Sequence, residues 1–274
     1  MKIDVDHITR IIAEVADEEI MPRFQKLNSG DIMEKSPGDL VTTADLEAET
    51  KLIARLQDAL PGSLVVGEEG VSENKSVLDA LESDNPVWII DPVDGTRNFA
   101  NGESVFGTMV ALSLSGEIIA GWIHDPARSR TAVAEKGAGA VLSGKKLQVR
   151  DITAFERMTV ALSFSHRQWI EQRAIDGLGP VPHMARRYGS VAHDYISLAC
   201  GEFHCAQYRR LNPWDHAPGV LIHREAGGYD QMIAAKEPYK AQIYAEDCLL
   251  LTPNKEIWEQ ARAFLNPGSD SYHV

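Results

Sequence analysis

Apolar residues recur at helical spacing in two stretches near the start of the chain. From residue 6 to 26 the aliphatic side chains fall three or four positions apart, which predicts an amphipathic helix. A second helix is predicted from Thr42, where a Thr-x-x-Asp capping pattern precedes an apolar series closed by Pro61-Gly62. The polar residues 30–40 between them predict an exposed loop.

Short apolar runs further along the chain predict buried strands that end in acidic residues. The run at residues 64–67 stops at Glu68. The run at residues 87–90 stops at Asp91, which we expect to be the first residue to leave its strand. From residue 105 to 142, apolar segments broken by turn pairs predict antiparallel strands.

The second half of the chain alternates strand and helix patterns after a polar seam near residues 144–157. Its predicted strands lie at residues 159–163, 203–208 and about 240–251, and its predicted helices near 166–177, near 191–200 and from about 215. This pattern predicts two domains, a helix-plus-antiparallel-sheet domain at 1–150 and a mixed α/β domain at 151–274. The last residues, 266–274, are expected to be loose.

Composition narrows the functional classes. The chain has 274 residues, of which 44% are hydrophobic and 24% charged, as in globular proteins. Its net charge of −13 disfavours a nonspecific nucleic-acid binder, and an anionic substrate would need local positive charge, for which metal ions are a ready source. No apolar stretch is long enough to span a membrane, and the start lacks a signal-peptide pattern. Three cysteines without a CxxC pair fit a cytoplasmic protein.

The segment Asp91-Pro92-Val93-Asp94-Gly95-Thr96 carries the most chemical information. Pro92 and Gly95 should bring both carboxylates together at the carboxyl end of the strand. Two carboxylates about 4 Å apart repel by roughly 4 kcal/mol at an effective dielectric near 20, and a divalent cation reverses that cost. Oxygen ligands favour Mg²⁺ or Mn²⁺. An ordinary strand-to-turn connection is the alternative, because Asp, Pro and Gly are common in turns.

Three further acids stand at predicted element boundaries, and each also has a purely structural explanation. Asp45 could cap the second helix. Glu68 could be an exposed turn residue. Asp215 could be a first-turn acid favoured by the helix dipole. Their occurrence together with the Asp91–Thr96 segment is what favours a shared site.

With these segments, the sequence resembles the inositol monophosphatase family of metal-dependent phosphatases. The matching segments are Lys35-Ser36, Asp39 to Asp45, Gly67-Glu68-Glu69, Trp88 to Phe99, Pro213-Trp214-Asp215 and Glu225 to Gly228. The resemblance implies a layered αβαβα sandwich in the α+β class, as in inositol monophosphatases and fructose bisphosphatases. It also implies Mg²⁺-dependent hydrolysis of a small phosphate monoester, sensitivity to lithium, and commonly a homodimer.

The resemblance also assigns roles by position. Glu68, Asp91 and the carbonyl of Val93 would hold one metal, and Asp91, Asp94 and Asp215 a second; Glu68 would also touch a weaker third ion. Glu69 would be a neighbouring partner. Gly95 and Thr96 would meet the phosphate, and Thr96 with Asp45 would orient the attacking water and help to deprotonate it. Lys35 resembles a lysine of the family's mobile loop, although it could equally be a solvated charge.

The substrate is less well defined by the sequence. The resemblance places the alcohol near Ser190 and Val191, and near Tyr208 and Arg209 in the segment before Trp214. The aromatic-basic run from Tyr208 to Arg210 favours a second anionic group or a planar ring if it lines the pocket, and is otherwise a solvated strand end. Inositol monophosphate, histidinol phosphate, a nucleotide 3′-phosphate and a sugar bisphosphate all stay open.

Two rival functions stay open as well. Phosphatases with an aspartate nucleophile also carry an Asp-Gly-Thr ending, but their two aspartates stand two positions apart rather than three. A regulatory protein that keeps the fold but binds a partner is the other rival. The complete set of acids argues against lost catalysis, because unused buried carboxylates are costly.

Overall fold

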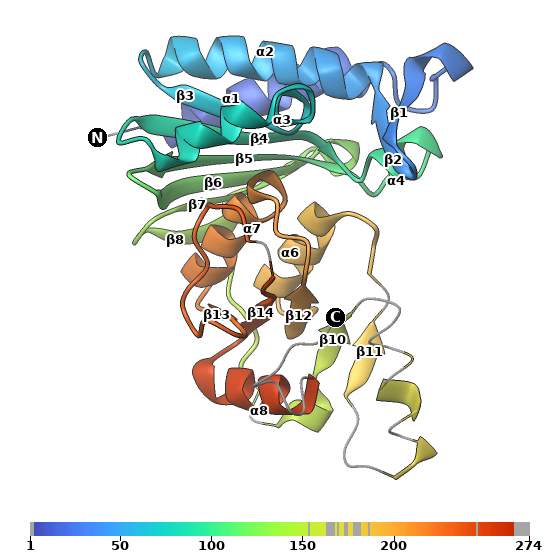
Figure 1. Ribbon diagram of the computed structural model, residues 1–274, viewed down its shortest axis with the longest axis vertical. Helices are drawn as coiled ribbons and strands as arrows, with labels where there is room; N and C mark the ends of the chain where they lie inside the picture. Colours follow the sequence, from blue (N-terminus) through green and yellow to red (C-terminus); the bar gives the residue numbers. More distant parts are fainter. Residues whose placement is uncertain are drawn as a thin grey trace.

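The computed structural model describes residues 3–265 apart from 153, 163–167, 169, 173–174, 178–181, 186 and 245 (Figure 1). The helix expected near residues 166–177 lies partly outside the described residues, and positions 168, 170–172 and 175 are helical. The tail at 266–274 lies wholly outside them.

Two long helices cover one face of a seven-stranded sheet. Helix α1 (Val5–Val15) ends earlier than expected, because the chain widens into one π-helical stretch, η1 (Ala16–Ile20). Helix α2 (Thr43–Ala59) has the predicted capping box, formed by Thr42 and Asp45. Both helices bury aliphatic side chains against the sheet. Figure 1 shows the two helices lying over it at the blue end of the chain.

The seven-stranded sheet follows the predicted antiparallel order except at its first strand, which pairs in parallel with the second. Its strands are β3 (Leu64–Gly67), β4 (Pro86–Asp94), β5 (Gly107–Leu114), β6 (Glu117–Asp125), β7 (Arg130–Glu135), β8 (Gly139–Leu142) and β9 (Lys145–Lys146). Strand β4 continues through Asp94, so the expectation that Asp91 leaves the strand is wrong. Its register against β5 shifts between Asp91 and Asp94, which keeps both residues paired despite Pro92.

A second helix layer and a second sheet complete the molecule. Helices α6 (Val191–Ala199) and α7 (Pro213–Glu225) lie between the sheets, and α8 (Lys255–Leu265) covers the outer face of the second one (Figure 1). The second sheet has the order β11 (His183–Ala185), β10 (Thr159–Ala161), β12 (Cys205–Tyr208), β14 (Leu249–Thr252) and β13 (Tyr229–Met232). The five layers confirm the predicted αβαβα sandwich.

The alternation of side chains along β4 determines what faces each helix layer. Trp88 and Ile90 pack with α1 and α2, whereas Val87 and Ile89 pack toward α6 and α7. Asp91 continues the odd-numbered series. Its carboxylate therefore faces the middle helix layer, where α7 begins.

Residues 30–40 are not the loop that their polarity predicts. They form a hairpin of β1 (Ile32–Ser36) and β2 (Asp39–Thr42), joined at Pro37-Gly38, where Gly38 adopts φ 81°. Arg97 donates to the Gly38 carbonyl at 2.6 Å and ties the hairpin to α4 (Thr96–Ala100). The expected late strand is also shorter than predicted, since among the described residues of that region only Leu249–Thr252 pairs, and β13 lies outside it.

The remaining described helices are short. They are α3 (Glu68–Glu73) and the 3₁₀ turns η2 (Ser29–Asp31), η3 (Lys75–Glu82), η4 (Pro126–Arg128) and η5 (Phe155–Arg157). All three cysteines are free. Within the described part of the chain, none of the helices has both the length and the apolar character that crossing a bilayer requires.

Candidate active site

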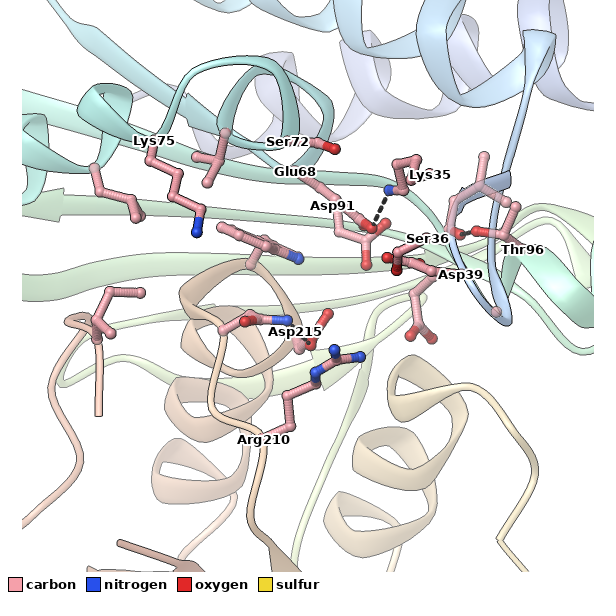
Figure 2. Close-up of a pocket in the computed structure, with 18 residues that line it drawn as sticks. Lys35, Ser36, Asp39, Glu68, Ser72, Lys75, Asp91, Thr96, Arg210 and Asp215 are labelled. Carbon is pink, nitrogen blue, oxygen red and sulfur yellow. Dashed lines mark hydrogen bonds and ion pairs between the residues drawn. The ribbon is translucent and has the colours of Figure 1, made fainter. Parts of the chain in front are cut away.

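A cavity of about 730 Å³ opens where the β1–β2 hairpin, the start of α3, the end of β4 and the start of α7 meet (Figure 2). It brings together segments from both halves of the sequence. The predicted site residues that line it are Lys35, Glu68, Asp91, Val93, Asp94, Gly95, Thr96 and Asp215. The strand-end and helix-start positions inferred from the sequence therefore do converge.

Three carboxylates form a compact cluster in this cavity. One oxygen from each of Glu68, Asp91 and Asp215 lies within 4.8 Å of the other two. Glu68 opens α3 at the end of β3, and Asp215 lies in the first turn of α7 after Pro213, which suits a helix start. Burial, followed by the charge of Glu68, raises the pKa of both Asp91 and Asp215 well above the ordinary value.

The cluster has the chemistry of a hard cation site. Asp91 Oδ1 is buried and has no hydrogen-bond partner among the described residues. Such an atom is costly unless a cation or proton satisfies it. Carboxylate oxygens from three elements are the ligand type that Mg²⁺ and Mn²⁺ accept, and Val93 lines the same cavity. The residues present thus fit a divalent metal.

Lys35 reaches into the cluster from the hairpin. Its Nζ lies 2.8 Å from Glu68 Oε1, the pair drawn in Figure 2, and 3.1 Å from Glu69 Oε1. Burial lowers the pKa of Lys35, but the two carboxylates outweigh it, so the net pKa is raised. Burial and the charge of Glu68 raise the pKa of Glu69 to about 8. Lys35 is therefore a cationic partner of this cluster rather than a solvated surface charge.

Asp45 has two roles at once. Its Oδ2 accepts from the Thr42 backbone N–H at 2.9 Å, as the capping pattern predicts. Its Oδ1 lies 3.1 Å from the Thr96 hydroxyl, which is also 3.0 Å from the Val93 carbonyl oxygen. Burial raises the pKa of Asp45 to about 6. The structure thus connects a buried carboxylate to the cavity through one hydroxyl.

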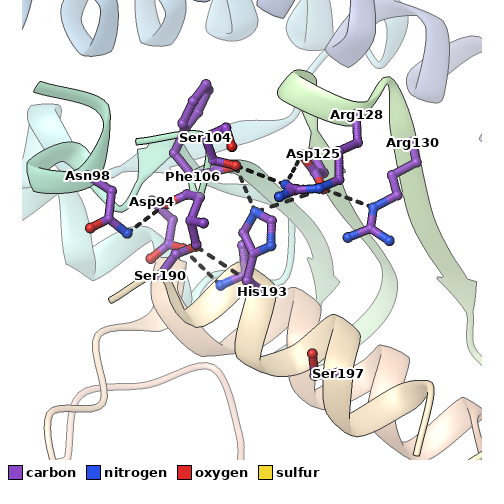
Figure 3. A network of polar contacts seen from close by, with 12 residues as sticks. Asp94, Asn98, Ser104, Phe106, Asp125, Arg128, Arg130, Ser190, His193 and Ser197 are labelled. Carbon is purple, nitrogen blue, oxygen red and sulfur yellow. Dashed lines mark hydrogen bonds and ion pairs between the residues drawn. The ribbon is translucent and has the colours of Figure 1, made fainter. Parts of the chain in front are cut away.

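Asp94 is more fully hydrogen-bonded than its neighbour Asp91. Its carboxylate accepts from the backbone N–H of Val191 at 3.1 Å, from the N–H of Ala192 at 2.8 Å and from the Ser190 hydroxyl. Figure 3 shows this carboxylate at the start of α6. Asp94 lies outside the three-carboxylate cluster found among the described residues. Its placement therefore includes a clear structural function, anchoring α6 to the end of β4.

None of the residues predicted to bind the substrate alcohol is part of the cavity lining. Ser190 and Val191 contact Asp94 but are not part of the cavity lining. Tyr208 is buried, and the Arg187 guanidinium carbon lies 4.4 Å from the centroid of the Tyr208 ring. Tyr208 does not reach the cavity. Arg209 is exposed and also outside the lining, whereas Arg210 is part of it. Because β12 ends at Tyr208 between two packed layers, the following loop rather than the strand reaches the cavity.

Sequence reasoning missed Glu49. This buried acid of α2 accepts from the backbone N–H of Glu69 at 2.9 Å and of Gly70 at 2.8 Å, which holds the first turn of α3 and hence Glu68. A Cβ at Gly67 would lie 2.5 Å from the Glu49 carboxylate, so a larger residue there would have to displace that carboxylate. The signal available was the spacing of Asp45 and Glu49, one turn apart on α2.

Asn212 and Asp39 were also missed. Asn212 Nδ2 donates to Asp215 Oδ2 at 3.1 Å and so orients one member of the cluster. Asp39 lines the cavity from the hairpin, close to the labelled Ser36 in Figure 2. Both residues lie inside segments that carry the family resemblance or directly adjoin them, so position in the motif was the only available signal.

Known proteins share this sequence pattern and this fold. The model of the inositol monophosphatase family matches residues 4–262. The inositol-1-monophosphatase of Bacillus subtilis is 34% identical over 228 residues, covering 81% of this chain and 82% of that protein. The Nus factor SuhB of Xylella fastidiosa is 30% identical over 250 residues, covering 89% and 88%. The solved IMPase of Thermotoga maritima has the same fold, with a TM-score of 0.79, 24% identity and coverage of 95% and 96%. The chain therefore belongs to the inositol monophosphatase family.

Proposed function

We propose that the chain is a Mg²⁺-dependent phosphomonoesterase that hydrolyses a small phosphate ester by direct attack of water. The observation that carries this proposal is the cluster of Glu68, Asp91 and Asp215, in which Asp91 Oδ1 has no hydrogen-bond partner among the described residues. Membership of a phosphatase family supports the reaction type. The carbonyl of Val93 and the carboxylate of Asp94 would complete the ligand set, as the family resemblance implies.

Mg²⁺ in this cluster, or Mn²⁺ in its place, would neutralise the phosphate and acidify the attacking water, which is the usual contribution of paired cation sites. The remaining steps belong to the chain. Thr96 would hold the attacking water by hydrogen bonding, and Asp45 would accept the proton that this water loses. The pKa of Asp45, about 6, is suitable for a base of this kind. The water oxygen forms a bond to phosphorus as the ester oxygen leaves and takes up a proton.

This arrangement favours direct hydrolysis over a phosphoenzyme. Asp91 is buried among other acids, and as a metal ligand its oxygens would be engaged by the cation rather than free to attack phosphorus. Glu69 and Lys35 would hold the position and charge of Glu68 during turnover. Trapping an acyl-phosphate on Asp91 after rapid quenching would contradict this proposal.

The direct test is phosphate release from a panel of small esters with Mg²⁺ and with EDTA. Release with Mg²⁺ and its loss with EDTA are expected, and no metal-dependent release from any ester would contradict the proposal. Thr96→Val and Thr96→Ser form a matched pair. We expect kcat to fall about 10²-fold in the first and to be largely retained in the second, because only the hydroxyl differs in function.

A regulatory role is the second candidate. A relative of similar length carries the name Nus factor SuhB, and it matches this chain over 250 residues. Such a role would use the surface of the same fold and is compatible with catalysis. Failure of the turnover assay with retained folding would favour it. The homodimer and the inhibition by lithium that the family resemblance implies are predictions for light scattering and for inhibition assays.

A further inference from the structure

His216 follows Asp215 in α7, but its side chain is buried and is not part of the cavity lining. Three tyrosine rings surround the imidazole, with centroids 4.8 to 6.3 Å from its own. They belong to Tyr195 of α6, to Tyr208 at the end of β12 and to Tyr239. Because consecutive helix positions point about 100° apart, Asp215 faces the cavity while His216 faces the packed layer beside it.

Both ring nitrogens of His216 have a hydrogen-bond partner. Nε2 lies 2.8 Å from the carbonyl oxygen of Arg210, and Nδ1 lies 2.9 Å from the hydroxyl of Tyr195. A carbonyl oxygen only accepts, so Nε2 carries the hydrogen and Nδ1 of the neutral ring accepts from the tyrosine. The Tyr195 ring lies against Gly219 of α7, where a Cβ would lie 2.2 Å from it. The imidazole therefore connects a closely packed side chain of α6 to the backbone that precedes α7.

The backbone bound by His216 belongs to the connection 209–212, which joins β12 to α7. Two side chains of this connection line the cavity, those of Arg210 and Asn212. Figure 2 shows Arg210 reaching into the cavity beside Asp215. Asn212 Nδ2 donates to Asp215 Oδ2 at 3.1 Å. The path of these four residues therefore determines where a cation and an amide stand at the cavity.

We infer that His216 is a positioning residue, whose bond to the Arg210 carbonyl keeps Arg210 and Asn212 in place at the cavity. This inference rests on the proposed function, because its consequences are for the binding of the ester and of Mg²⁺. Arg210 brings positive charge to an anionic ester in a chain with a net charge of −13. Asn212 orients a carboxylate of the acid cluster. His216 itself touches neither ligand and acts through the connection.

His216→Phe is the main test, because phenylalanine keeps an aromatic ring and removes both hydrogen bonds. Loss of one hydrogen bond of ordinary strength would leave the binding arrangement about one tenth populated, so KM for the ester should rise about tenfold. We expect kcat to stay within about threefold, because the lost binding is common to the ground state and the transition state. The Kd of Mg²⁺, measured by calorimetry without ester, should also rise. A wild-type KM and Kd in this variant would overturn the inference.

Two milder variants keep the test independent of large changes in packing. In His216→Gln the amide can still donate to the Arg210 carbonyl, so KM should stay within about threefold of the wild type. Tyr195→Phe removes only the hydroxyl that orients the imidazole, and it should raise KM by less than His216→Phe does. A KM in His216→Gln as high as that in His216→Phe would contradict a role through hydrogen bonding.

His223 is the matched control, two turns later in the same helix. It is equally buried, and its Nε2 lies 3.0 Å from the carbonyl oxygen of Thr252 on β14, outside the cavity lining. His223→Phe should lower Tm without raising the KM of the ester or the Kd of Mg²⁺. Equal rises of KM in His216→Phe and His223→Phe would mean a general loss of packing, and would overturn the positioning role.

A double-mutant cycle tests whether His216 acts through Arg210. Arg210→Gln alone should raise KM, because it removes the charge that the connection carries to the cavity. His216→Phe added to Arg210→Gln should raise KM by less than about threefold, since the two changes remove the same contribution. A further tenfold rise in the double variant would overturn the route through Arg210.

Hydrogen–deuterium exchange examines the connection without turnover. Peptides covering residues 209–212 should exchange about tenfold faster in His216→Phe than in the wild type, and at the wild-type rate in His223→Phe. Unchanged exchange in His216→Phe would overturn the inference, whether or not the protein hydrolyses an ester. Faster exchange in a protein that hydrolyses no ester would support the positioning role and contradict only the proposed function.

Discussion

Asp230 and Asp91 are both buried carboxylates, but one faces an arginine and the other faces acids. Arg224 holds both oxygens of Asp230, with Nε and Nη2 at 2.6 and 2.8 Å. Asp91 has Glu68 and Asp215 as its neighbours and one oxygen without a partner among the described residues. The folded chain thus satisfies the first carboxylate by itself and leaves one oxygen of the second unsatisfied among the described residues.

Asp125 differs from the acids of the cavity in the same way, because it is paired with cationic side chains. Asp125 is fully buried and lies 2.9 Å from Arg130 Nε and 3.2 Å from Arg128 Nη1, in the network drawn in Figure 3. A buried carboxylate with its own cation serves the fold, whereas a cluster of carboxylates short of cations costs stability. Such a cost is accounted for if the cluster works with a metal.

The largest expected effect concerns Asp91→Asn. Removing the central carboxylate should lower Mg²⁺-dependent phosphate release by about three orders of magnitude, because the bound metal contributes several kcal/mol to the transition state. In EDTA its free energy of unfolding should equal or exceed that of the wild type, because repulsion among the acids is reduced. Phosphate release and urea unfolding measure the two effects. Loss of stability in EDTA would mean that Asp91 is a structural acid like Asp230.

The converse change is Asp230→Asn. It should lower the free energy of unfolding by about 1–3 kcal/mol, because it breaks a partly buried ion pair with Arg224. Turnover per folded molecule should stay near the wild-type value. Urea unfolding together with kcat checks both statements. A large loss of kcat in fully folded protein would contradict the assignment of Asp230 to stability rather than to catalysis.

Mg²⁺ itself should stabilise the protein through the cavity. At a concentration a hundredfold above Kd, one bound ion adds about 2.7 kcal/mol to the free energy of unfolding. The wild type and Asp230→Asn should both show this rise in Tm on addition of MgCl₂, and Asp91→Asn should not. Equal rises in all three proteins would place the stabilising ion elsewhere.

The smallest expected effect, on the pH dependence of stability, concerns Asp194. This carboxylate is intermediate between the two kinds because it has an arginine nearby but not in close contact. Burial raises its pKa from 3.8 to about 7, against the lowering effect of Arg187, whose Nε lies 3.8 Å away. The unfolded chain releases this proton first, so the contribution of Asp194 to stability should be greatest below pH 3.8 and be lost as the pH rises through about 7. Asp194→Asn should show a shallower fall in Tm between pH 4 and 8. Parallel profiles would contradict the assignment.

Much of the site could be predicted because acids at element ends are visible in the sequence. Glu68 follows an apolar strand and opens a helix, and Asp215 lies in the first turn of another helix, as the sequence predicts. Glu49 could not be found in this way, since an acid inside an amphipathic helix normally faces solvent. Only the path of α3 beneath α2 shows that its carboxylate is buried.

The missed strands share a physical cause. Strand β1 is mostly exposed, so it has no apolar alternation to mark it, and its hairpin is held by long-range contacts such as that of Arg97 with Gly38. Strand β13 carries Asp230, whose arginine partner lies on α7. Tyr208 and Arg209 were predicted to bind substrate, but of the run Tyr208 to Arg210 only Arg210 lines the cavity, because the sequence does not show where β12 ends. In each case, tertiary contacts determined the outcome.

Helix α2 contributes no residue to the cavity lining, yet it determines the spacing of two of its walls. Asp45 reaches Thr96 on one side, and Glu49, one turn later, holds α3 on the other. One residue inserted between them would rotate Glu49 by about 100° and leave Asp45 in place. Glu68 would then lose its support while the Thr96 side stayed intact, so the dimensions of the cavity depend on the pitch of a helix outside it.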